Sequence, residues 1–254
     1  MTLISLFTRY VIIQTLLFAA AVTQAASSAD IVQAALNNSE RPSEDMLDDS
    51  RRMPLEVLAF AGIEEGMTIL EMEAGTGYYT EILSRAVGSD GSVIMQNPPA
   101  FDSFFGEAVG ARLANNRLSN VTLSRVNFDQ LEANDNSVDM VTWILGPHEL
   151  GFEPGGQSVG NPERAFEDIA RVLKPGGVFL AVDHRAAEGS DITVGGTLHR
   201  ISESLVMSLA NGAGLSIERS SYLHANSNDS LEAGVFDPSI QGQTDKFVLL
   251  FRKQ

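Results

Sequence analysis

Residues 71–77, EMEAGTG, place two acidic side chains and two glycines directly after a short apolar run. Gly75 and Gly77 permit a positive φ and let backbone approach a ligand closely. A helix beginning at Tyr78 would add free N–H groups and a partial positive charge. A turn with these features can bind a small ligand through its backbone, although strand-to-helix turns also use glycine for steric reasons alone.

The charge of this turn narrows the choice of ligand. Glu71 and Glu73 would repel a bound phosphate by roughly 4 kcal/mol for unit charges about 4 Å apart at an effective dielectric near 20. A pyrophosphate cofactor such as NAD, and with it a nicotinamide-dependent oxidoreductase, is therefore disfavoured. A ligand carrying an ammonium and a sulfonium would be attracted, and S-adenosylmethionine (SAM) meets that description.

The histidines are the side chains best suited to act as a general base near neutral pH. We expect catalytic groups in His148, which follows one apolar run, and in Asp183 and His184, which end another. A role in capping or packing a loop is the alternative for both, and is the interpretation we favour for His224.

The same side chains could also hold a metal ion. His148, His184 and His199 would be the ligands, with Asp183 or Glu149. Their spacing matches no compact ligand motif, so we predict no metal site.

Strands and helices alternate along the chain, which implies right-handed crossovers and a mostly parallel sheet. In such sheets ligands lie beyond the carboxyl ends of the central strands. That rule points to residues 71–78, 96–99, 127–131, 145–149 and 183–186. We expect strands at 67–72, 91–96, 120–127, 137–145, 176–184, 215–223 and 245–253, and helices at 54–63, 78–87, 101–115, 162–173 and 198–214.

The chain resembles the class I SAM-dependent methyltransferases in the order of four stretches: GMTILEMEAGTGYYTEILSRAVG, GSVIMQN, NSVDMVTW and LKPGGVFLAVDHR. A narrower resemblance, to the exported methyltransferases of proteobacteria, rests on four further stretches: RRMPLEVLAFAGIEEG, VDHRA, GTLHRI and FDPSIQGQTDKFVLLFRK. The resemblance covers about residues 50–254. It implies an α/β, Rossmann-like fold: a mostly parallel seven-stranded sheet with an antiparallel C-terminal strand and helices on both faces.

The resemblance also implies roles for residues of the glycine turn. Glu71 matches the acid that ends the first strand and contacts the methionine end of the cofactor. Ala74, Gly75 and Gly77 match the turn that approaches the cofactor closely, and Glu73 replaces its usual first glycine.

Two asparagines stand where this family commonly has acids. Asn97 matches the residue that holds the ribose hydroxyls, and Asn127 the residue that accepts a bond from the adenine amino group, with Phe128 as a ring contact. An amide can still accept such bonds. Each replacement exchanges a charge-assisted bond of about 1.5–3 kcal/mol for one nearer 1 kcal/mol.

The N-terminal segment of the chain suggests where the protein acts. The first 25 residues have the pattern of a signal peptide cleaved after Ala25: a basic Arg9, an apolar run at 10–22 and TQA at 23–25. We therefore expect residues 1–25 to be removed and the protein to be periplasmic. A retained anchor is the alternative. Residues 26–50 read as a loosely attached lead-in with one short helix, before a single domain over 51–254.

Charge and cysteine content exclude several classes of protein. With 17 Lys and Arg against 33 Asp and Glu, the net charge is −16, which disfavours nucleic acid and anionic membranes as partners. The chain has no cysteine, hence no disulfide or thiolate site.

We therefore expect a methyltransferase that uses SAM and a small-molecule acceptor. The alternative is an exported binding protein of the same fold that has lost catalysis, which Glu73, Asn97 and Asn127 would favour.

Overall fold

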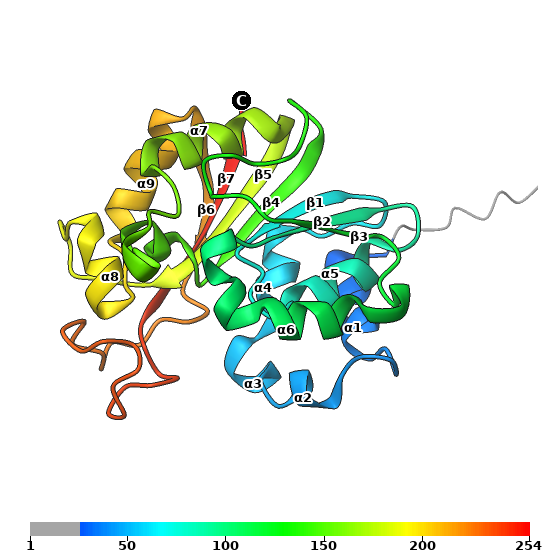
Figure 1. Cartoon of the computed structure of the whole chain (residues 1–254), viewed down its shortest axis with the longest axis horizontal. Helices are drawn as coiled ribbons and strands as arrows, with labels where there is room; N and C mark the ends of the chain where they lie inside the picture. The colour runs from blue at the N-terminus through cyan, green and yellow to red at the C-terminus, as the bar shows by residue number, and fades with distance from the viewer. Residues whose placement is uncertain (1–25) are drawn as a thin grey trace, which may run out of the picture.

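The computed structural model describes residues 26–254, so the predicted signal peptide lies outside the described residues. One seven-stranded sheet runs through the molecule in the order β3-β2-β1-β4-β5-β7-β6 (Figure 1). Its strands are β1 Thr68–Met72, β2 Ser92–Gln96, β3 Val121–Ser124, β4 Val138–Ile144, β5 Leu173–His184, β6 Leu215–Ser221 and β7 Lys246–Lys253.

The strands from β3 to β5 are parallel, and β7 is antiparallel to both β5 and β6. The predicted mostly parallel sheet with an antiparallel C-terminal strand is confirmed. β1, β4 and β5 are neighbours at its centre, and their carboxyl ends lead into the residues after Met72, Ile144 and His184. These three ends carry most of the predicted site.

Helices cover both faces of the sheet. α1 Ser28–Leu36, α4 Pro54–Ala61 and α5 Tyr78–Val87 pack on one face, and α7 Pro162–Val172 and α9 Glu203–Gly212 on the other (Figure 1). α7 shows why the sequence folds this way: Asn161 caps its first turn, and only its Ala165, Phe166, Ile169 and Val172 stripe is buried. The remaining helices are α2 Ser43–Met46, α3 Asp49–Arg52, α6 Asp102–Leu113 and α8 Gly195–Leu198.

The helix predicted at 198–214 is wrong at its start. α8 ends at Leu198, His199 has a left-handed φ of 52°, and α9 begins only at Glu203. Between them Arg200 is fully buried against Asp229, and Ile201 forms a bridge to Arg185. These tertiary contacts outweigh the helical pattern of the local sequence.

The lead-in is packed against the domain, contrary to the expectation of loose attachment. It holds two helices and the start of a third in place of one, and Ile31, Val32 and Ala35 of α1 are buried against α4 and α5. Within residues 26–254, no helix has both the length and the apolar character needed to cross a membrane.

Candidate functional site

The glycine turn between β1 and α5 is tied to the end of β2. The Gly75 N–H donates to Asn97 Oδ1 at 2.9 Å, and Asn97 Nδ2 donates back to the Gly75 carbonyl at 3.0 Å. Gln96 Oε1 accepts from the Glu73 N–H at 2.9 Å. The turn needs its glycines, since Gly75 and Gly77 have φ of 58° and 87°.

A cavity of about 230 Å³ lies over this turn. Its walls include Arg52, Glu71, Glu73, Gly75, Tyr78, Tyr79, Phe105, Ile144 and Leu145. The open space at Gly75, where an added Cβ would meet nothing within 4 Å, lets a ligand reach backbone at the start of α5.

Glu71 presents a buried carboxyl to this cavity. It is 4% exposed and accepts a hydrogen bond from the Thr80 hydroxyl. Burial raises the pKa of Glu71 to about 8, although Thr80 and the charges of Arg112 and Arg52 act against the rise. A cationic ligand would favour the ionised form of this carboxyl, which is what an ammonium group requires.

Glu73 points away from the turn toward β4. Its backbone has a left-handed φ of 48°, and Trp143 Nε1 donates to its Oε2 at 3.4 Å. Burial, followed by the negative charge of Glu149, raises the pKa of Glu73 well above its ordinary value. The carboxyl of the side chain that replaces a glycine therefore lies beside Trp143 and Gly146, near the end of β4.

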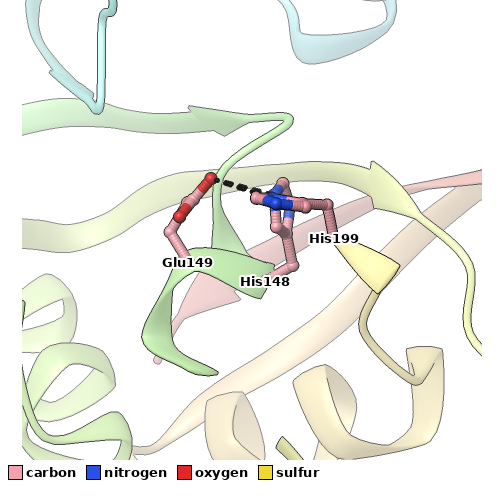
Figure 2. A group of neighbouring side chains, drawn as sticks. All are labelled: His148, Glu149 and His199. Atoms are coloured by element: carbon pink, nitrogen blue, oxygen red, sulfur yellow. Dashed lines mark ion pairs between the residues drawn. The ribbon is translucent and has the colours of Figure 1, made fainter. Parts of the chain in front are cut away.

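Three of the predicted histidines come together beyond the ends of β4 and β5. The His148 ring centroid lies 5.4 Å from that of His199 and 6.0 Å from that of His184. Figure 2 shows His148, Glu149 and His199 pointing toward one another. His224 is not part of this group; it lines a different cavity with His184.

Asp183 orients His148. Both Asp183 oxygens contact residue 148: Oδ1 lies 2.8 Å from the ring Nδ1, and Oδ2 accepts from the backbone N–H at 2.7 Å. On the other side of the ring, His148 Nε2 lies 3.1 Å from Glu149 Oε1. Asp183 is fully buried and His148 is 4% exposed, so the ring is held rigidly.

The two strand-end histidines differ in charge. Burial alone would lower the pKa of His148, but the carboxylates of Asp183 and Glu149 outweigh it and raise that pKa well above the ordinary value. Burial lowers the pKa of His184 to about 2, and the nearby His148 charge adds to the effect. His184 is therefore neutral near pH 7, with its Nδ1 bonded to Thr244 Oγ1 at 2.7 Å.

An apolar cavity of about 310 Å³ adjoins the histidine group. We call it the phenylalanine pocket; its walls are Phe101, Phe104, Phe105, Phe152 and Phe236 together with Glu73, Glu149 and His199. Glu73 and Phe105 also line the cavity over the glycine turn. The two cavities therefore share a wall.

The remaining predicted contacts are located as follows. Asn97 is 4% exposed, its amide oxygen and nitrogen both bond to Gly75, and it does not line the glycine-turn cavity, so its contact with ribose hydroxyls stays a prediction. Phe128 is fully buried, with its ring centroid 4.7 Å from that of Trp143, so no face of the ring is open in this structure. Asn127 is partly buried after β3, and its contact with an adenine stays a prediction.

Sequence reasoning missed Arg52 and the phenylalanine pocket. Arg52 packs over the Tyr78 ring at 4.5 Å and lines the glycine-turn cavity, where its charge acts on Glu71. The only signal in the sequence was FDSFF at 101–105, which reads as a helix start and gives no hint of a pocket.

Comparison with known proteins shows what this part of the chain is similar to. Residues 70–181 match the model of the family described as "Methyltransferase domain". The match runs from β1 into β5 and supports a methyltransferase domain in this part of the chain. SAM is the methyl donor of such domains.

Individual relatives agree with this assignment. The chain is 30% identical over 127 residues to a ubiquinone/menaquinone biosynthesis C-methyltransferase of Hydrogenovibrio crunogenus, covering 50% of this chain and 45% of that protein. The chain thus spans about half the length of the curated relatives it matches. In structure it is similar to a SAM-dependent methyltransferase from Aquifex aeolicus (TM-score 0.57, 24% identity, 84% of this chain and 98% of that chain). It is also similar to a SAM-dependent methyltransferase from Mesorhizobium loti (TM-score 0.57, 15% identity, 82% and 100%). Both structural likenesses concern the fold.

The glycine-turn cavity fits the amino-acid end of SAM. Glu71 offers a carboxyl for the ammonium, and Arg52 offers a guanidinium for the carboxylate, in the walls of one cavity. When bound, SAM would supply an electrophilic methyl group. The chain's part is to hold that group against an acceptor and to exclude water.

Proposed function

We propose that the methyltransferase domain transfers a methyl group from SAM to a small, mainly apolar acceptor with an aromatic or quinone-like ring, bound in the phenylalanine pocket. The observation that carries the proposal is the wall of Glu73 and Phe105 shared by the two cavities. A donor over the glycine turn and an acceptor among the phenylalanines would be neighbours. The name of the matched relative refers to ubiquinone and menaquinone biosynthesis, and quinones carry a ring of this chemical class.

His184 lies at the carboxyl end of β5 in a small cavity that shares Arg52, Tyr79, Ile144 and Leu145 with the glycine-turn cavity, and it does not line the phenylalanine pocket. A histidine with a pKa of about 2 is a weak proton acceptor near pH 7, so the catalytic role expected for His184 stays a prediction. Asp183 and His148 would serve as the pair that orders the loop after β4.

The first experiment measures SAM and S-adenosylhomocysteine binding by calorimetry. Tritium transfer from methyl-labelled SAM to a panel of phenols, hydroquinones and amines follows. We expect micromolar binding, weakened at least tenfold in Glu71→Gln, and transfer to ring-containing acceptors.

Phe104→Ser separates acceptor binding from donor binding. Phe104 is 61% exposed, so its loss should leave the fold intact. Removing this apolar wall should raise the acceptor KM by roughly tenfold, corresponding to about 1.4 kcal/mol, with SAM affinity unchanged. Tyr222→Ser, at a residue 85% exposed and outside both cavities, is the matched control. An unchanged KM in Phe104→Ser would remove the acceptor from this pocket.

A wild-type chain that does not bind SAM, together with a Glu73→Gly variant that does, would favour the second candidate. That candidate is a binding protein of methyltransferase fold without catalysis. The observations that support this second candidate are the left-handed φ of Glu73 and the raised pKa of its partly buried carboxyl.

We also propose that residues 1–25 direct export and that the protein acts in the periplasm, as in the exported proteobacterial group it resembles. The support is the basic Arg9, the apolar run 10–22 and the small residues at 23 and 25. Cell fractionation with mass spectrometry of the N-terminus tests this. A mature chain beginning at Ala26 is expected; an intact N-terminus in the cytoplasm would refute it.

A further inference from the structure

We propose that His148, Glu149 and His199 form a binding site for one divalent transition-metal ion. Among the described residues, these three offer nitrogen and oxygen atoms that all lie within 4.8 Å of one another. Glu149 Oε1 is 3.1 Å from His148 Nε2 and 3.5 Å from His199 Nδ1. An ion bonded at about 2.1 Å keeps neighbouring ligand atoms roughly 3.0–3.4 Å apart, so the spacing is close to that of a formed site.

The environment of His148 is that of a metal ligand. Its Nδ1 lies 2.8 Å from the fully buried Asp183 carboxylate, which directs Nε2 toward Glu149 and His199. Histidines that bind metals almost always place their second nitrogen against a carboxylate or carbonyl in this way.

Glu149 has an unused buried oxygen. The residue is 8% exposed, and its Oε2 has no hydrogen-bond partner among residues 26–254. A buried carboxylate oxygen without a partner is costly unless something binds it. A cation bound by both oxygens of this carboxylate would satisfy Oε2, and Figure 2 shows the Glu149 carboxylate turned toward the two imidazoles.

The backbone is built to bring His199 to this position. A Cβ at Gly195 would lie 1.9 Å from the His148 carbonyl oxygen, and one at Gly196 2.5 Å from the Gly151 carbonyl oxygen. The two glycines let α8 pack directly on the turn that carries His148 and Glu149. The left-handed φ of His199 is strain of the kind that collects at functional sites.

Two imidazoles and one carboxylate suit Zn²⁺ or Fe²⁺ and leave coordination positions open. Glu149 and His199 both line the phenylalanine pocket. An ion held there would offer an open position to an oxygen of the acceptor. This last step rests on the proposed function, whereas the metal site itself does not.

The test uses the full chain, stripped with a chelator and titrated with Zn²⁺ and with Co²⁺ in the absence of SAM. We expect one equivalent of Zn²⁺ per chain, and visible Co²⁺ absorption that Zn²⁺ abolishes. His199→Ala and Glu149→Gln should each weaken Zn²⁺ binding by at least tenfold, and Asp183→Asn by 10- to 100-fold. His224→Ala, at a histidine outside the group, should bind Zn²⁺ as the wild type does.

His199 is 22% exposed at its side chain, so His199→Ala should fold even if variants of the buried His148 do not; circular dichroism checks this. Less than 0.1 equivalent of Zn²⁺ on the wild type, or unchanged affinity in folded His199→Ala, would overturn the site. Stoichiometric Zn²⁺ without methyl transfer would support the site and count against the proposed function. Methyl transfer by a chain that binds no Zn²⁺ would count against the metal site and support the proposed function.

Discussion

Single residues set the charge of the glycine-turn cavity, and the ionisation of Glu71 is the most informative to measure. Its folded-state pKa of about 8 exceeds the ordinary value of 4.5, because burial favours the protonated form. Between these two values the unfolded chain has released the proton and the native chain has not. The free energy of unfolding should therefore fall as pH rises through this window, by about 1.4 kcal/mol per pH unit for this group, and level off above pH 8.

Glu71→Gln removes this titration while keeping the size of the side chain. The stability of the variant relative to wild type should grow between about pH 5 and 8 and then stay constant. Because the pKa of Glu73 is also raised, only the difference between the two proteins isolates Glu71. Urea denaturation at several pH values measures it. A difference that does not change with pH would mean that Glu71 is ionised in the native chain.

Single elements position the histidine group, and α8 is the one that carries His199 to it. Gly195→Ala would place a methyl group 1.9 Å from the His148 carbonyl oxygen and force α8 away from its neighbour. We expect a loss of about 1–3 kcal/mol in the free energy of unfolding, and weaker Zn²⁺ binding.

Gly212→Ala in α9 is the matched control for that substitution. An added Cβ at Gly212 meets nothing within 4 Å, and its φ is not positive. The change should be neutral or stabilise the chain by up to about 1 kcal/mol. Equal effects of the two variants in urea denaturation would contradict the role given to Gly195.

At the scale of the whole molecule, Glu81 joins the lead-in to the domain. Its fully buried side chain pairs with Arg85, Arg112 and Arg117. These arginines also reach the lead-in: Arg85 and Arg117 contact Glu40, and Arg112 pairs with Asp45 at 2.6 Å. One carboxylate thus organises three cations between parts of the chain that are distant in sequence.

Glu81→Gln should lower the free energy of unfolding by about 3–5 kcal/mol, because it leaves partly buried guanidinium groups without their shared partner. The lead-in should also become more sensitive to limited proteolysis. Glu107→Gln, at an exposed position of α6, should change neither property. A Glu81→Gln chain as stable and as resistant as Glu107→Gln would show that hydrophobic contacts of α1 alone hold the lead-in.

Much of the fold could be predicted because its signals are local. Alternating apolar runs predicted the seven strands and their mostly parallel arrangement, and Gly75 and Gly77 predicted the turn. The prediction failed at 198–202, where the buried Arg200–Asp229 pair, 29 residues apart in sequence, decides the backbone path. A helical pattern in the local sequence carries no information about a partner that lies 29 residues away along the chain.

For the site, the sequence alone determined the acidic glycine turn and placed Asp183, His148 and His184 at strand ends, because the carboxyl ends of parallel strands meet at one edge of a sheet. Only the tertiary structure decided that Glu73 faces β4, that His199 reaches Glu149, and that phenylalanines between residues 101 and 236 enclose one pocket. Those choices depend on packing between distant segments. Backbone contacts such as Gly195 against His148 select one arrangement among many that the same local sequence would allow.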